Sequence, residues 1–84
     1  MIPLNGYIEM ASAYLLLNVE TGTEVEVIKS LEPLEEVKEA RMVYGVYDIV
    51  VRVETASMEE LKNAVSWTIR RLDKVRSTMT MIVV

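Results

Sequence analysis

The chain has 84 residues, enough for one small domain, and it contains neither cysteine nor histidine. These absences exclude disulfides and thiolate or imidazole metal ligands, and they remove the most common general base. The net charge of −4 disfavours binding to a phosphate backbone, and no apolar run reaches the roughly 18 residues of a membrane span. Apolar residues make up 51% of the chain, which predicts apolar surface left over for a partner subunit.

The first twelve residues are predicted to form an extended lead-in. Pro3 and the pair Asn5-Gly6 favour turns, and no helical period is present. A basic start followed by a long apolar centre is missing, so no signal peptide is expected and the predicted location is cytoplasmic. The domain itself is expected to span residues 13–84.

A strand and a short helix are predicted next. The apolar run Ala13–Val19 indicates a central strand. The helix is expected to begin at Thr21 or Thr23, because each has a glutamate three residues later in the capping-box spacing. It should end at Glu32-Pro33, since proline cannot continue the hydrogen-bond ladder. Its buried face is expected to comprise Val25, Ile28 and Leu31.

A tight hairpin is predicted in the middle of the chain. Its strands are Val37–Tyr44 and Tyr47–Glu54, and only Gly45 and Val46 separate them. Glycine supplies the positive φ that a two-residue turn needs. Arg41 and Arg52, one on each strand, could hold a carboxylate ligand bidentately, but ion pairs across strands or between subunits are the favoured interpretation.

A longer helix and a last strand complete the pattern. Ser57, with Glu60 three residues later, is expected to cap a helix that ends near Leu72, and Val75–Val84 is the last predicted strand. Trp67 lies off the apolar stripe of this helix and is expected at an interface. The stripe consists of Leu61, Val65, Ile69 and Leu72, with Met58, Ala64 and Thr68 at its edges. A basic cluster is expected to be solvated at the helix end: Arg70, Arg71, Lys74 and Arg76.

The order strand, helix, strand, strand, helix, strand predicts an α+β ferredoxin-like βαββαβ fold with an antiparallel sheet. The two helices are expected to cover one face of the sheet. The other face carries Tyr14, Leu16 and Val50, which are too apolar for an open face. Two sheets are therefore predicted to meet in a dimer of the α+β barrel type.

Three segments resemble one known family. They are Val43–Val51 with its Gly-x-Tyr-Asp turn, Met58–Leu61, and Val75–Val83 with its Ser-Thr-x-Thr strand. Together they resemble the effector-binding domain of the Lrp/AsnC transcription regulators, also called the RAM domain, over nearly all of residues 13–84. The resemblance is closest to archaeal members that consist of this domain alone. Full-length regulators carry a helix-turn-helix that twelve residues cannot build, so this chain is not expected to read DNA itself.

The resemblance implies a partner and a site. Family domains dimerise through their sheets, and the dimers assemble further. A small effector, usually an amino acid, binds in a cleft where dimers meet, and no cofactor is implied. Full-length regulators of the family become possible partners for co-assembly. Both motifs line the cleft, and the residues implied here are Gly45, Val46, Tyr47, Asp48, Thr78, Met79 and Thr80.

Other interpretations of these residues stay open. Gly45 is needed by a hairpin turn whether or not a ligand exists. Asp48 could pair with an ammonium group or bond local backbone N–H groups. Asp48 beside Tyr47 could also transfer a proton, although no catalytic or metal-binding constellation accompanies the pair. The alternative functions are a cofactor-free enzyme on a dimeric α+β barrel and a purely structural oligomerisation module.

Overall fold

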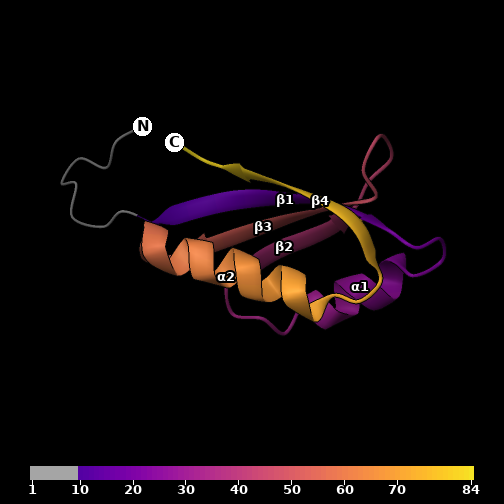
Figure 1. The fold of residues 1–84 in the computed structure, drawn as a ribbon, viewed down its shortest axis with the longest axis horizontal. Helices are drawn as coiled ribbons and strands as arrows, with labels where there is room; N and C mark the ends of the chain where they lie inside the picture. Colours follow the sequence, from indigo (N-terminus) through magenta and orange to yellow (C-terminus); the bar gives the residue numbers. More distant parts are fainter. Residues whose placement is uncertain (1–9) are drawn as a thin grey trace.

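The computed structural model describes residues 10–84, so most of the predicted lead-in lies outside the described residues. The elements follow the predicted order of strands and helices (Figure 1). They are β1 (Ala11–Val19), α1 (Glu24–Leu31), β2 (Val37–Met42), β3 (Ile49–Thr55), α2 (Met58–Arg71) and β4 (Val75–Ile82). β1 therefore begins two residues before the predicted start, and β4 ends two residues before the predicted end.

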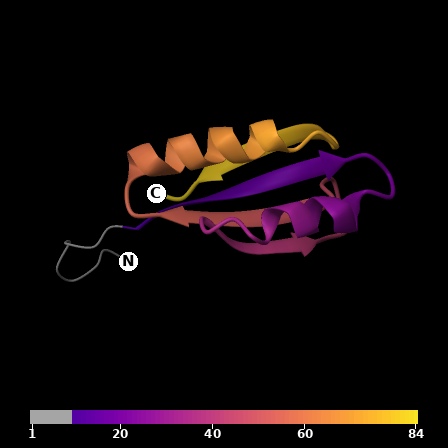
Figure 2. The same cartoon turned by 90° about the horizontal axis from the view of Figure 1, so that it is seen from below.

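The strands form one antiparallel sheet in the order β2-β3-β1-β4. Both helices lie side by side on the same face of this sheet, with α1 near β2 and α2 over β3 and β1 (Figure 2). This arrangement confirms the predicted ferredoxin-like fold. None of the helices and strands of residues 10–84 covers the opposite face of the sheet.

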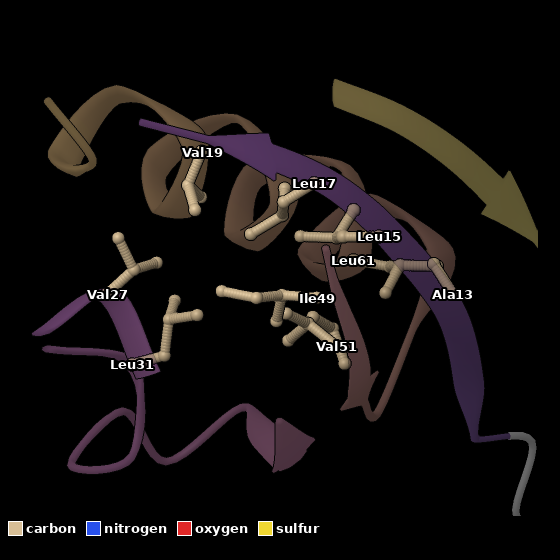
Figure 3. Packing of buried hydrophobic residues seen from close by; sticks show 10 residues of the cluster. Ala13, Leu15, Leu17, Val19, Val27, Leu31, Ile49, Val51 and Leu61 are labelled. Atoms are coloured by element: carbon tan, nitrogen blue, oxygen red, sulfur yellow. The ribbon is translucent and has the colours of Figure 1, made fainter. Parts of the chain in front are cut away.

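The core lies between the sheet and the two helices. Alternate residues of β1 and β3 point into it, because successive side chains of a strand point to opposite faces. Their side chains converge with those of α1 and α2 (Figure 3). The buried apolar residues are Ala13, Leu15, Leu17, Val19, Val27, Leu31, Ile49, Val51, Val53 and Leu61.

The buried face of helix α1 includes Ile28 and Leu31 as predicted, but Val27 takes the place of the predicted Val25. Val27 and Leu31 are buried and Ile28 packs against them, whereas Val25 is 55% exposed. Both sets of residues have helical spacing, so the spacing alone did not separate them. The N-cap is Thr23, but no capping box forms, because its hydroxyl donates to the Glu20 carbonyl at 2.7 Å. The predicted end at Glu32-Pro33 is confirmed.

Helix α2 is capped as predicted. The Glu60 backbone N–H donates to Ser57 Oγ at 3.2 Å, and Ser57 is the N-cap. The predicted stripe faces the core, because Leu61 is fully buried and Val65 and Leu72 pack against the core, while Thr68 at the edge of the stripe is only 1% exposed. Thr68 Oγ1 has no hydrogen-bond partner among residues 10–84. A buried hydroxyl in this condition lowers stability.

Thr68→Val is expected to raise the free energy of unfolding by about 1 kcal/mol, because a methyl group replaces the unpaired hydroxyl. Chemical denaturation measures this change. Thr68→Ser is the matched control. It keeps the hydroxyl and removes a methyl group, so it should lower stability by about 0.8 kcal/mol. A destabilised valine variant would mean that the hydroxyl has a partner.

The connection between β2 and β3 is longer than the predicted two-residue turn. It spans residues 43–48 and projects from the end of the sheet, away from the helices (Figure 1). The Val43 N–H donates to the Asp48 carbonyl at 2.9 Å and closes the base of this loop. The predicted tight hairpin at Gly45-Val46 was therefore wrong in length, although the two strands do pair.

The uncovered face of the sheet, called here the open face, has an apolar half and a charged half. The apolar half lies mainly over β1 and β4 and comprises Tyr14, Leu16, Val50, Met79 and Met81. The charged half lies over β2 and β3 and comprises Glu39, Arg41, Arg52 and Glu54. Arg52 Nε lies 3.9 Å from Glu39 on the neighbouring strand, so the favoured interpretation of Arg52 as half of a cross-strand ion pair is confirmed.

Glu39 is expected to titrate below its ordinary range. The hydrogen bond from Arg41, followed by the positive charge of that residue, lowers the pKa of Glu39. A lowered folded-state pKa stabilises the fold above the ordinary glutamate pKa of about 4.3, and this contribution is lost as the pH falls through the folded value. The effect on stability is small because the pair is exposed. Carbon-detected NMR titration should show the lowered pKa, and Arg41→Gln should raise it again.

Candidate functional site

One end of the sheet gathers the residues that the two sequence motifs predicted. β1 and β2 end there, while β3, β4 and α1 begin there. The 43–48 loop rises from this end (Figure 1). Antiparallel pairing therefore brings together chain segments that are up to about sixty residues apart, such as Asn18 and Ser77.

The tip of the 43–48 loop is open to solvent. Tyr44 and Val46 are fully or almost fully exposed. Gly45 has φ +145°, a conformation that side-chain-bearing residues rarely adopt. A Cβ at Gly45 would meet no atom within 4 Å, so backbone conformation and not space demands the glycine.

Asp48, at the base of the loop, is anchored to β1. Its backbone N–H donates to the Leu17 carbonyl at 2.9 Å. Its carboxylate Oδ2 accepts from the Val19 N–H at 3.0 Å. The pairing of β1 with β3 ends at Leu17 and Ile49, which leaves the Val19 N–H on that side of β1 for a side-chain acceptor. Asp48 thus has a structural role within the chain. It forms hydrogen bonds with the backbone of β1, and one of its two carboxylate oxygens takes part in them.

A polar hollow of about 400 Å³ lies beside Asp48. It is lined by Asn18, Val19, Asp48, Arg76 and Ser77. Asn18 Nδ2 donates to Ser77 Oγ at 3.1 Å and so links β1 to β4 at the wall of the hollow. Among residues 10–84, neither the Asp48 carboxylate nor the Arg76 guanidinium forms an ion pair. The hollow thus presents one negative and one positive group that do not neutralise each other.

A second hollow of about 250 Å³ touches the other side of Asp48. Its walls are Glu24 at the start of α1, Met42, Val43 and Tyr44. Met42, Val43 and Tyr44 make the lining of this hollow mostly apolar. Asp48 is the one predicted site residue that lines both hollows.

The structure brings the two motifs together at one point but does not gather all seven predicted residues. Tyr47 Oη lies 3.7 Å from Met79 Sδ, a contact between the loop and β4. Met79 pairs with Leu16 and points to the open face, whereas Thr78 and Thr80 pair with Leu17 and Leu15 and point to the other face. Both threonines are exposed, because the helices do not cover β4 there.

Three residues of the polar hollow were missed by sequence reasoning. Asn18 stands at the end of the first predicted strand, and Ser77 begins the Ser-Thr-x-Thr motif without being one of the seven implied site residues. Arg76 was assigned to a basic cluster at a helix end. The signal that could have found them is topological, because a βαββαβ sheet pairs the end of the first strand with the start of the last.

The side chains of Tyr47 and Asp48 have separate partners. The Tyr47 hydroxyl contacts the Met79 sulfur, and no hydrogen bond joins it to Asp48 within the described part of the chain, so the proton-transfer pair does not form there. Residues 10–84 contain no group of three or more histidine, cysteine, aspartate or glutamate side chains placed to hold a metal ion. In the same residues, no helix has the length and apolar character to cross a membrane.

The fold and the hollow define a small α+β domain with a polar hollow at one end of its sheet. Residues 12–84 match the family model described as the Lrp/AsnC ligand binding domain. The chain belongs to this family.

Curated relatives of the chain are transcription regulators. It is 37% identical over 71 residues to the HTH-type transcriptional regulator FL11 of Pyrococcus abyssi, covering 84% of this chain and 46% of that protein. It is 39% identical over 57 residues to the regulatory protein AsnC of Haemophilus influenzae, covering 68% of this chain and 38% of that protein. The chain thus spans less than half the length of these relatives, which support a regulatory role.

Solved structures show the same fold. FFRP-DM1 superposes with a TM-score of 0.81 and 38% identity, over 88% of this chain and 99% of that one. A hypothetical protein from Pyrococcus horikoshii gives a TM-score of 0.82 and 38% identity, over 88% and 89% of the two chains. E. coli AsnC gives 0.78 and 27%, over 88% of this chain and 50% of that one.

Proposed function

We propose that this domain is a regulatory sensor that binds an amino acid or a similar small metabolite beside Asp48. The ligand lies in a cleft that a second dimer completes, and its binding changes the assembly of a transcription regulator. The observation that carries the proposal is the polar hollow in which Asp48 and Arg76 stand without an ion pair within the described residues.

The charges of the hollow match those of an α-amino acid. An ammonium group can bind the Asp48 carboxylate, whose Oδ2 is already fixed by the Val19 N–H. A carboxylate can bind the Arg76 guanidinium through two parallel hydrogen bonds. Asn18 and Ser77 add further polar groups at the wall. A ligand with only one of these charges would leave the other site group unpaired.

The exposure of the site favours a cleft between dimers. Ligand pockets usually bury about 70–90% of a small ligand, and a hollow bounded by exposed Arg76 and Ser77 cannot do so with one chain alone. Four of the predicted residues are also exposed, and no element of residues 10–84 covers them: Gly45, Val46, Thr78 and Thr80. A second dimer placed against this end of the sheet would cover them. The dimer itself would form through the apolar half of the open face.

The proposed mechanism is a population shift. A ligand held by two dimers binds the assembled form only, so it stabilises that form in proportion to its occupancy. A regulator that carries the same type of domain could join such an assembly, and the ligand would then control its oligomeric state. Homo-oligomers and co-assemblies with Lrp/AsnC regulators are the expected partners.

Thermal unfolding against a panel of amino acids at millimolar concentration tests the proposal. A ligand at 100 times its Kd should add about 2.7 kcal/mol to the free energy of unfolding. For each amino acid that acts, the matching amine and the matching carboxylic acid are measured as well. Both should fail to stabilise the protein, because each lacks one of the two charges. Light scattering with the active ligand should show a larger assembly.

Arg76→Gln should abolish the ligand-induced shift and leave the melting temperature of the free protein unchanged. Lys62→Gln is the matched control, because it makes the same change in net charge on the exposed side of α2, away from the hollow. If the matching amine, which lacks the carboxylate, also stabilised the protein, Arg76 would not be part of the ligand site. If none of the panel changes the melting temperature or the assembly size, the domain is a structural oligomerisation module instead.

A further inference from the structure

Helix α2 carries a stripe of interface-type residues away from the proposed ligand site. Glu60, Trp67 and Arg71 lie within about 40° of one another around the helix axis, at 100° per residue. Trp67 is 51% exposed, and the Arg71 guanidinium lies 4.4 Å from the centroid of its ring. Exposed tryptophan and arginine are the residues most enriched among those that dominate protein interfaces.

A hollow of about 360 Å³ adjoins this stripe. It is lined by Glu60, Asn63, Ala64 and Trp67 of α2, together with Glu36 before β2 and Thr55 at the end of β3. A water molecule occupies about 30 Å³, so the hollow is large enough for a side chain. Ala64 contributes only a methyl group to the wall. Among residues 10–84, Glu36 and Glu60 have no cationic partner.

The charges of α2 are complementary to a second copy of the same helix. Glu59 and Glu60 occupy its first turn, and Arg70 and Arg71 occupy its last turn. Two such helices packed antiparallel would bring acidic ends against basic ends at both ends of the contact. A two-fold axis at the midpoint between residues 65 and 66 pairs residue 71 with residue 60, and residue 67 with residue 64. The indole would then face the small residue that borders the hollow.

We infer that α2 is a self-complementary interface with a second copy of this chain. The Trp67 indole of each protomer enters the partner's hollow beside Ala64, and Arg71 binds the partner's Glu60. A two-fold contact repeats each of these interactions twice. The helices lie on the face of the sheet opposite the open face (Figure 2). Contact through α2 and contact through the open face can therefore coexist, which gives the chain a route to assemblies larger than dimers.

The test is association without any ligand, so its outcome is independent of the proposed sensing function. Trp67 is the only tryptophan in the chain. Its fluorescence emission should shift to shorter wavelengths as the protein concentration rises, because the indole leaves water. Analytical ultracentrifugation should show the same association. Trp67→Ala should weaken it at least tenfold, with the circular dichroism of the fold retained.

A charge exchange tests the antiparallel pairing. Glu60→Arg and Arg71→Glu should each weaken association at least tenfold, because each places like charges in contact. The double variant Glu60→Arg/Arg71→Glu should restore it, because the two charges have changed places. Lys62→Glu, which lies on another side of the helix, should leave association unchanged. The inference would be overturned if the emission wavelength of Trp67 did not change with protein concentration. It would also be overturned if the double variant associated as weakly as the single variants.

Discussion

Replacing Leu15 with alanine is expected to lower the free energy of unfolding by about 2–5 kcal/mol. Leu15 lies in the middle of β1, the strand that pairs with both β3 and β4, and its side chain is fully buried. Alanine would remove apolar atoms from the point where sheet and helices meet, and the surrounding chain can fill that space only partly. Small domains are commonly stable by about 5–15 kcal/mol, so this one change removes a large share. Urea denaturation measures it.

Leu16→Ala is the matched control. It removes the same atoms from the neighbouring residue, whose side chain points to the open face and is half-buried in the single chain. If the proposed dimer buries that face, the free energy of unfolding lost in Leu16→Ala should depend on protein concentration. The free energy lost in Leu15→Ala should be the same at every concentration. Should the alanine variant of Leu15 not fold, Leu15→Val gives a smaller loss of the same kind. A loss of less than about 1 kcal/mol in the free energy of unfolding of Leu15→Ala would contradict the packing described.

The fold could be predicted because local patterns and global arrangement agree in this chain. The alternation of β1 and β3, the capped helix α2 and the order of elements all point to one topology. The buried face of α1 could not be predicted, since Val25 and Val27 are both compatible with a helical stripe. In the structure the helix is rotated so that Val27, and not Val25, is buried in the core.

The loop between β2 and β3 was mispredicted for a related reason. Gly45-Val46 has the composition of a two-residue turn, but the base of the loop is held by other partners. Asp48 directs both its N–H and its carboxylate to β1, and Val43 bonds to the carbonyl of Asp48. The strands therefore separate at Met42 and Ile49. Arg76 was missed because it was grouped with the basic residues Arg70, Arg71 and Lys74 shortly before it, while its neighbours in space are set by the pairing of β1 with β4.

The double role of Asp48 leads to an expected difference between two substitutions. Asp48→Ala should lower the free energy of unfolding by about 1–3 kcal/mol without any ligand, because the Val19 N–H loses its acceptor. Asp48→Asn retains a carbonyl oxygen at this place and should cost less than about 1 kcal/mol. Both variants remove the negative charge, so both should lose the stabilisation by an amino acid. Chemical denaturation with and without ligand separates the two effects.

The asparagine variant is the decisive one, because its fold is intact while its charge is gone. An ammonium group needs an acceptor with negative charge to offset the loss of its hydration, and an amide provides only a weaker dipole. Loss of the ligand response in Asp48→Asn, with unchanged stability of the free protein, would assign Asp48 to ligand binding as well as to the anchoring of β1. A ligand response equal to that of the wild type would leave Asp48 with the structural role alone and would place the ammonium group elsewhere.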